Sequence, residues 1–483
     1  MLRARRPAGC AFLGCGTMSQ SDKLRLSEKI AYGFGDLGSC LYWASFSNFL
    51  LIFYTDVFGI EGAVVGTIFL WSRIWDGVND PLIGALADRT KTRWGKFRPY
   101  LLWLCVPFAL AGVLAFTTPN LDAAGRVIWA WVTYNLVMML YTAINIPYTA
   151  LLGVISPDSL ERTHVSSIKF LFAFGAGVIV KASLPWLTKV LGAGVPARGW
   201  QLTFVVYGIA AVAFFLVTFW GTKERVTPPP AQKTDLGRDL LDVVTNVPWL
   251  LLLATTLPFI LFVATRSTIT AHYIKYYVGE QTLTLPFLGT RVYGYEELMS
   301  SFGVIGDVAA IPGVLLVTWF ARVVGKKLAF SILFGVAIVM TAAFYVLAPH
   351  QVGWMFLLQI IGSATGAPLS VLLWAMYADT ADFAEWKRGR RATGLVFSAS
   401  TMSQKMGWAV GGFLAGKMLT STGFVANAIQ APEALEGIKS MMSLYPAAAG
   451  VVALVIFMIY PLGENKVAEI ERDLRQRREG QSA

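Results

Sequence analysis

Three charged side chains interrupt one strongly apolar stretch of the sequence. Arg73, Asp76 and Asp80 occur within "TIFLWSRIWDGVNDPLIGALA", at spacings of i, i+3 and i+7. Residues at these spacings share one face of an α-helix. A charge at the centre of a membrane costs about 2.5–3.5 kcal/mol on insertion scales, so buried charges usually face a cavity or a partner. This face is therefore a candidate functional site.

The residue types on this face favour a small, hard cation. Carboxylate and amide oxygens from Asp76, Asp80 and the adjacent Asn79 are the ligand atoms that such ions prefer. The stretch contains no His or Cys, so a transition metal is not favoured. A structural ion pair is the alternative, but Arg73 alone neutralises only one of the two aspartates. We therefore predict a binding site for a small, hard cation at Asp76 and Asp80, and no other cofactor.

The composition places these residues in a membrane. The 483 residues are 55% hydrophobic and only 14% charged, whereas soluble proteins average about 25% charged residues. The net charge of +11 comes from Lys and Arg in short loops between apolar runs. That pattern is typical of loops beside anionic lipid rather than of nucleic-acid binding. The four cysteines have no disulfide or metal-site spacing and are expected to be inert.

The apolar runs predict an all-α membrane protein with twelve transmembrane helices. A spanning helix needs about 20 mostly apolar residues. The expected spans are 31–54, 62–87, 99–117, 126–153, 164–188, 202–221, 247–277, 297–320, 328–347, 352–377, 393–419 and 441–462. A polar, proline-rich stretch at 222–239 separates them into six plus six, and weak similarity between the halves fits a parallel repeat.

These boundaries predict the domain organisation and the orientation. We expect a cytoplasmic N-terminal segment (1–30), a six-helix bundle (31–221), a cytoplasmic central loop (222–246), a second bundle (247–462) and a basic cytoplasmic tail (463–483). Lys and Arg crowd alternate loops, which places both termini in the cytoplasm and the chain in the inner (plasma) membrane. Residues 1–17 are expected to precede the true start at Met18 or to form a disordered tail.

Several motifs together resemble one family of transporters. They are "YGFGDLG" (32–38), "FYTDVFGI" (53–60), "RIWDGVNDPLIG" (73–84), "RWGKFRP" (93–99), "YTAINIPYTAL" (141–151) and "ADTADFAEWKRGRR" (378–391). They resemble the glycoside–pentoside–hexuronide:cation symporters of the major facilitator superfamily, the group that includes melibiose permease. The resemblance covers the first eleven expected helices in order. It implies a 6+6 pseudo-symmetric bundle that works by alternating access.

The resemblance also assigns roles around the cation. It implies that Asp76 and Asp80 are the cation carboxylates and that Asn79 and Thr142 add oxygen ligands. It further implies that Lys405 approaches the carboxylates from the other half, although a purely structural counter-ion is the alternative. Sodium and proton coupling both stay open, and the two extra oxygen ligands favour sodium.

The expected sugar site departs from the family pattern. Where melibiose permease has two aspartates, this sequence has Cys40 and Asn145, and Thr149 and Lys169 occupy its aromatic and arginine positions. Loss of two carboxylates makes galactosides doubtful and favours pentosides, other neutral glycosides or an acidic sugar. Alternatively, the Lys169 side chain extends its ammonium group to the membrane surface and does not contact the sugar.

Further residues are expected to contact the sugar or one another. Tyr141 and Trp374 are candidates to stack on a sugar ring, with helix packing as the alternative. Asp36 is expected to pair with a loop arginine, and Arg266 to pair with Asp307, with substrate contact as the alternative for each.

A cytoplasmic gate is expected between the halves. The basic residues Arg93, Lys96 and Arg98 lie on one half, and the acidic residues Asp379, Asp382 and Glu385 lie on the other. Ion pairs between these sets would close the inner side, and the alternative is a solvated surface of little energetic consequence.

The combined interpretation is symport of a glycoside or related sugar by a functional monomer in the lipid bilayer. A carrier of an amphipathic lipid or drug-like substrate and a non-transporting membrane sensor are the alternatives. An enzyme is not expected, because the three histidines (His164, His272 and His350) lie in no catalytic motif.

Overall fold

The computed structural model describes residues 24–156, 159–225, 245–285, 289–388 and 393–481. The expected start at Met18, residues 1–17 and most of the expected central loop lie outside the described residues. The first half contains α1 (Leu26–Ile52), a π-helical turn η1 (Phe53–Val57), α2 (Gly62–Arg89), α3 (Arg98–Ala115), α4 (Ala123–Val154), α5 (Ser159–Gly192) and α6 (Pro196–Gly221).

The second half repeats this helical pattern. It contains α8 (Val247–His272), a π-helical turn η2 (Tyr273–Val278), α9 (Tyr295–Val324), α10 (Lys326–Ala343), the 3-10 turn η3 (Phe344–Val346), α11 (Val352–Arg388), α12 (Thr393–Ser421), α13 (Pro432–Met442), α14 (Leu444–Met458) and α15 (Glu464–Gln481). A short antiparallel hairpin, β1 (Gln281–Leu285) with β2 (Gly289–Tyr293), connects η2 to α9.

Hydropathy alone misses the two helices that carry the charged site. Within the described residues, ten segments are long and apolar enough to cross a membrane, and neither α2 nor α12 is among them. The charges of α2, and the serines, threonines, Gln404 and Lys405 of α12, lower their hydropathy. Their lengths, 28 and 29 residues, still suffice for a membrane crossing. With these two helices the model agrees with the expected twelve-helix bundle.

Some helices are longer than the spans expected from the sequence, because the helix continues past its apolar residues. The span expected at 352–377 continues as α11 to Arg388, because "YADTADFAEWKR" remains helical while becoming amphipathic. The last span begins at Pro432 rather than 441, since Glu433, Glu436 and Lys439 obscured α13 in the hydropathy pattern. The chain bends between α13 and α14 at Ser443, whose φ of −126° and ψ of −77° are not helical.

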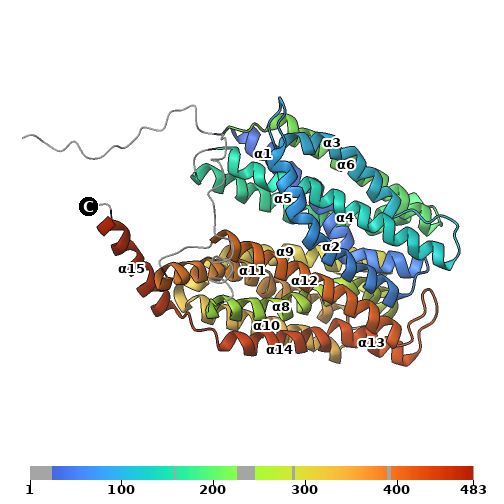
Figure 1. Cartoon of the computed structure of the whole chain (residues 1–483). Helices are drawn as coiled ribbons and strands as arrows, with labels where there is room; N and C mark the ends of the chain where they lie inside the picture. Colours follow the sequence, from blue (N-terminus) through green and yellow to red (C-terminus); the bar gives the residue numbers. More distant parts are fainter. Residues whose placement is uncertain (1–23, 157–158, 226–244, 286–288, 389–392, 482–483) are drawn as a thin grey trace, which may run out of the picture.

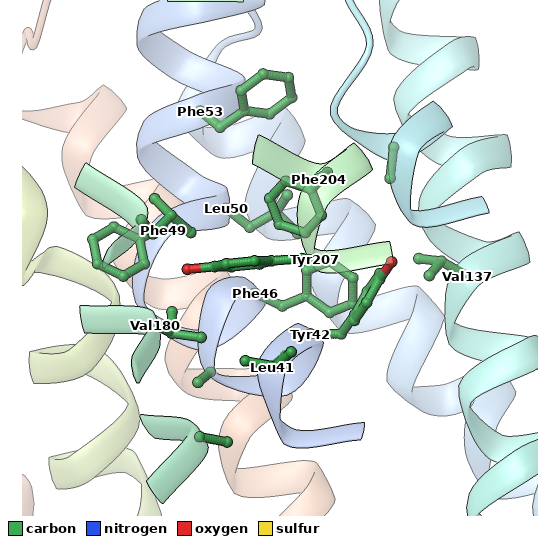
Figure 2. Packing of buried hydrophobic residues seen from close by; sticks show 14 of the residues in the cluster. Leu41, Tyr42, Phe46, Phe49, Leu50, Phe53, Val137, Val180, Phe204 and Tyr207 are labelled. Carbon is green, nitrogen blue, oxygen red and sulfur yellow. The ribbon is translucent and has the colours of Figure 1, made fainter. Parts of the chain in front are cut away.

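Helices α1–α6 gather in one group and helices α8–α14 in a second, as Figure 1 shows. Aromatic rings occupy the core of the first group, where Tyr42 and Phe46 of α1 lie beside Phe204 of α6 (Figure 2). The ring centroids of Tyr42 and Phe204 are 5.7 Å apart, and Phe116 stacks on Phe204. Because lipid is itself apolar, such packing stabilises the bundle through close van der Waals contact. It fixes α1 against α6, so that another face of α1 can meet the second half.

The two groups touch closely along α2 and α12. A Cβ atom built on Gly66 of α2 would lie 2.7 Å from the carbonyl oxygen of Phe413 on α12. One built on Gly416 would lie 3.0 Å from the backbone nitrogen of Gly66. Glycine therefore permits an approach that any side chain would obstruct. This contact places the charged face of α2 next to α12.

Candidate cation and sugar site

Asp76 is buried beside an arginine of its own helix. Its side chain is 2% exposed, and Arg73 Nη1 lies 3.0 Å from its Oδ2. The i, i+3 spacing on α2 brings the two groups together without help from another element. The guanidinium also lies over the ring of Trp43 on α1, 4.6 Å from the ring centroid. Arg73 is thus a charge partner of Asp76, as the sequence suggested.

Asp80 has its partner in the opposite half of the molecule. Lys405 of α12 donates from Nζ to Asp80 Oδ2, and both side chains are 26% exposed. Asp76 and Asp80 therefore each have a basic partner in this conformation. The spacing on α2 alone places Arg73 beside Asp76, whereas Lys405 comes from α12 and was expected here from the family resemblance.

Two polar atoms beside this ion pair lack partners. Asp80 Oδ1 and Asn79 Nδ2 are buried and make no hydrogen bond within the described residues. Thr142, the other expected ligand, is buried on α4, which packs against α2. Asp80 Oδ1 is an unpartnered carboxylate oxygen, the kind of ligand atom that a hard cation such as Na⁺ prefers.

Tyr141 and Asn145 of α4, two of the expected sugar residues, lie beside a group of aromatic rings. The Tyr141 ring is 5.9 Å from that of Trp43, and Trp43 also meets Trp408 of α12 edge-on. Asn145 donates from Nδ2 to the carbonyl oxygen of Tyr141, 3.1 Å away. Sequence reasoning missed Trp43, although its i+3 position after Cys40 places it on the same face of α1. Trp43 connects the aromatic group to Arg73 and hence to Asp76.

Lys169 and Asp36 form an ion pair in the same half. Lys169 Nζ lies 3.8 Å from Asp36 Oδ1, so the expected pairing of Asp36 with a loop arginine is wrong. The lysine comes from α5, which packs along α1. The ammonium also lies 5.5 Å from the Tyr148 ring centroid.

Two expected sugar residues are less closely tied to this group. Thr149 is exposed on α4. Trp374 of α11 contacts the ring of Tyr377, one turn later on its own helix, at 5.9 Å.

The expected pairing of Arg266 with Asp307 is also wrong. Asp307 of α9 pairs with Lys181 of α5 at 2.6 Å, across the two halves. Arg266 of α8 donates from Nη2 to Gln359 Oε1 of α11, also at 2.6 Å. The expected pair assumed that helices close together in the sequence face each other. In the structure α9 packs against α5 of the first half.

The basic residues expected at the cytoplasmic gate have contacts within the first half. Glu224 accepts hydrogen bonds from the backbone N–H groups of Lys96, Phe97 and Arg98 at 2.8–3.0 Å. Arg93 lies over the ring of Trp94, its neighbour in the sequence.

One residue of the acidic set, Asp379, forms an ion pair within the second half. Asp379 pairs with Lys326 at 2.7 Å, and Asp382 and Glu385 follow it on α11. The ribbons of the two groups diverge toward the end that carries α15 (Figure 1).

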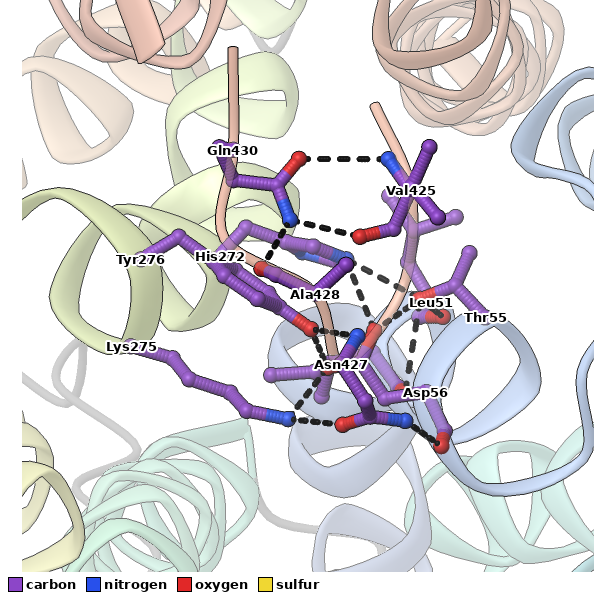
Figure 3. Close-up of polar contacts among 11 residues, drawn as sticks. Leu51, Thr55, Asp56, His272, Lys275, Tyr276, Val425, Asn427, Ala428 and Gln430 are labelled. Atoms are coloured by element: carbon purple, nitrogen blue, oxygen red, sulfur yellow. Dashed lines mark hydrogen bonds and ion pairs between the residues drawn. The ribbon is translucent and has the colours of Figure 1, made fainter. Parts of the chain in front are cut away.

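A polar cluster that the sequence analysis did not assign joins the halves at the other end. Figure 3 shows Asp56 at its centre, together with Lys275, Tyr276 and Asn427. Lys275 Nζ lies 2.5 Å from Asp56 Oδ2, and the Tyr276 hydroxyl donates to the same oxygen. Asn427 Nδ2 donates to the Asp56 carbonyl oxygen at 2.6 Å. The Asp56 side chain is 2% exposed, so this cluster is a built contact rather than a solvated surface.

The cluster is formed by two equivalent helix ends. Both α1 and α8 finish in a π-helical turn, η1 with Asp56 and η2 with Lys275. Each turn is followed by a glycine at positive φ, Gly59 at 71° and Gly279 at 65°. π-helical turns are frequent at functional sites. The sequence signal was the pair "FYTDVFG" and "YIKYYVG", which end corresponding helices of the two halves.

Comparison with known proteins agrees with this architecture. A family model described as "MFS/sugar transport protein" matches residues 31–464. The chain belongs to this family. The isoprimeverose transporter of Lactiplantibacillus pentosus is similar, with 33% identity over 92% of this chain and 91% of that protein. The inner membrane symporter YicJ of Escherichia coli (strain K12) is 33% identical over 91% of this chain and 93% of that protein.

This member of the sugar transporter family has the same fold as several solved transporter structures. A bacterial homologue of the human lysosomal transporter Spinster matches with a TM-score of 0.64 at 14% identity, over 90% of this chain and 95% of that chain. A mutant of the nucleoside transporter NupG matches with a TM-score of 0.62 at 13% identity, over 90% of this chain and 99% of that chain. The expected major facilitator fold is confirmed. The protein is a membrane-spanning sugar transporter and not an enzyme.

Proposed function

We propose that this sugar transporter couples a glycoside or related sugar to a cation bound at Asp76 and Asp80. Secondary active, cation-coupled symport of a sugar is its function, and the relatives do not favour the amphipathic-substrate carrier or the sensor. The observation that supports the site is the Lys405–Asp80 ion pair across the two halves. The Asp80 carboxylate, which would bind the cation, also forms the ion pair with the second half.

Competition for Asp80 provides a physical basis for coupling. A cation and the Lys405 ammonium both need the Asp80 oxygens, so cation entry weakens the contact between α2 and α12. The free Asp80 Oδ1 offers the entering ion a first ligand before Lys405 leaves. Asn79 and Thr142 would complete the ligand set, and such additional oxygen ligands favour Na⁺ over a proton.

The sugar site is proposed to respond through Trp43. Arg73 contacts both the Asp76 carboxylate and the Trp43 ring, so a change in charge at Asp76 alters the packing beside Tyr141. Binding of the cation thereby adjusts the aromatic group that we propose contacts the sugar, together with Cys40. By linkage, the sugar tightens cation binding by the same factor as the cation tightens sugar binding.

The conformation supports alternating access with the cytoplasmic side open. The basic loops favour cytoplasmic termini, and the end that carries α15 is the end at which the halves diverge. The Asp56 cluster closes the opposite, outer side. On reversal this cluster opens, and the basic set Arg93, Lys96 and Arg98 approaches the acidic set on α11. We propose that a monomer in the inner membrane carries out this cycle.

Uptake into proteoliposomes tests the cation site. Sodium and pH gradients are imposed separately while entry of a radiolabelled glycoside panel, pentosides included, is followed. Asp76→Asn is expected to abolish gradient-driven accumulation, because it removes a cation ligand and its charge. Asp122→Asn is the matched control, since this exposed residue caps α4 and asparagine also caps helices well.

Two outcomes distinguish the parts of the proposal. Accumulation by Asp76→Asn at the wild-type level contradicts the cation role. Accumulation driven by the pH gradient alone retains symport but rejects sodium as the coupling ion.

A further inference from the structure

A second polar region lies between the halves, away from the Asp76 ion pair. A cavity of about 260 Å³ is bounded by Asn48 of α1 and Lys181 of α5 on one side, and by α8, α9 and α11 on the other. Small-molecule sites usually begin near 300 Å³, so the space suits one sugar ring. Asn48 lies five residues beyond Trp43 on α1, about 7.5 Å farther along the helix axis.

The charges around this cavity do not cancel. Lys181 and Asp307 form a pair at 2.6 Å, so their charges offset each other. The charge of the Arg266 guanidinium then remains, and Arg266 donates a hydrogen bond to the neutral amide of Gln359 at 2.6 Å. Arg266 Nε is buried without a hydrogen-bond partner, and no carboxylate pairs with this arginine among the described residues. The cavity therefore has a net positive charge.

A structural role does not account for an arginine in this state. A charge within a membrane span is costly unless it has a partner of opposite sign, and an amide oxygen does not neutralise it. The Phe344 ring, 5.0 Å from Arg266 Cζ, gives a cation–π contact but no negative charge. The missing counter-charge is best supplied by the transported molecule.

We propose that Arg266 binds the acidic group, a carboxylate or a sulfonate, of a sugar acid in this cavity. The inference rests on the proposed function, since it names the substrate class of the same transporter. A guanidinium presents paired N–H donors that match the oxygens of such an anion. Gln359 and Ser363 line the cavity beside it and offer hydrogen bonds to sugar hydroxyls.

Binding to the purified full-length protein tests this assignment. Affinities are measured by titration calorimetry in saturating NaCl for three probes: methyl β-D-glucuronide, the corresponding 6-deoxy-6-sulfo glucoside and the neutral methyl β-D-glucoside. At least one acidic probe is expected to bind about tenfold or more tightly than the neutral probe, which corresponds to ~1.4 kcal/mol.

Two variants of the site and one control make the test specific. Arg266→Gln is expected to abolish the preference because it removes the receptor charge. Gln359→Glu is expected to do the same by placing a carboxylate where the amide oxygen now lies, 2.6 Å from the guanidinium. Arg322→Gln, at the end of α9, is expected to retain the preference. Thermal unfolding of each variant establishes that it is folded.

The possible outcomes separate this proposal from the proposed function. The assignment is overturned if neither acidic probe binds the wild-type protein, if the neutral probe binds as tightly, or if the preference survives in both site variants. Repetition with choline in place of sodium tests coupling independently. Sodium-independent binding of all probes contradicts the proposed cation coupling, while an Arg266-dependent acid preference would still stand.

Discussion

Lys405 is the residue on which the proposed coupling depends most directly. It lies 325 residues from Asp80 in the sequence and forms an ion pair with it between α12 and α2. A lysine that competes with a cation has a different effect from one that supports the cation site. Removal of a competitor tightens ion binding, whereas removal of a supporting residue weakens it.

We predict that Lys405→Gln binds sodium more tightly but accumulates sugar poorly. Without its competitor, the ion is expected to bind about tenfold more tightly, and cation entry no longer releases a contact between the halves. Sodium-dependent thermal stabilisation reports the affinity, because a ligand that binds the folded state raises its stability with concentration.

The control for this variant lies on the same helix. Lys417→Gln changes an exposed lysine of α12 and is expected to leave sodium affinity unchanged. Weaker sodium binding by Lys405→Gln would show that the lysine supports the ion and does not compete with it.

At the scale of elements, the contact of α2 with α12 decides how closely the halves approach. Gly416 lies where any side chain would meet the backbone of α2, 3.0 Å from the nitrogen of Gly66. Rocking of the halves requires this surface to close and reopen during each cycle. Small residues on both helices allow that without rearrangement of side chains.

We predict that Gly416→Ala destabilises this conformation by about 1–3 kcal/mol, the usual cost of overpacking. The added methyl group has no space, so α12 must move away from α2. The variant is expected to unfold at lower temperature in detergent and to transport more slowly.

Gly335→Ala on α10 provides the matched comparison, since a Cβ atom there meets no other atom within 4 Å. The two variants make the same chemical change on helices of the second half. Equal melting temperatures for them would contradict the importance of the α2–α12 contact.

At the scale of the whole molecule, charged contacts around Asp56 join the two halves at the end away from α15. Asp56 accepts from Lys275 at 2.5 Å, from Tyr276 and from Thr55 at 2.7 Å. These groups come from the equivalent ends of α1 and α8. A buried carboxylate that satisfies several donors holds this end closed while its charge remains.

We predict that Asp56→Asn shifts the protein toward an outward-open conformation. The neutral amide leaves Lys275 without its counter-charge, which weakens the closed end. A cysteine introduced at Asn48, in a background with all four native cysteines replaced by serine, is expected to react at least about threefold faster with a membrane-impermeant maleimide applied outside.

Glu297→Gln serves as the control, because this glutamate pairs with Arg291 at the same end but within the second half. Its labelling rate is expected to match that of the parent. Unchanged labelling in Asp56→Asn would show that the cluster does not control the outer opening.

The sequence alone determined the membrane class, the helical bundle and the charged face of α2. These follow from local rules: apolar length specifies a span, and the spacing of Arg73, Asp76 and Asp80 places them together on one helix. The family resemblance also anticipated that Lys405 approaches this face. Hydropathy was least informative for α2 and α12, because the functional groups themselves reduce their apolar character.

Only the tertiary structure decided which charges pair between helices. Asp307 meets Lys181 rather than Arg266, and Asp56 meets Lys275 from an equivalent helix end. Such pairings depend on how each helix is rotated about its axis and on which helices the two halves bring together. The spacing of residues along one helix determines neither of these. Arg266 is identified as lacking a negative partner only because Asp307 pairs with Lys181. The net charge around a residue can be counted only when all of its neighbours in space are known.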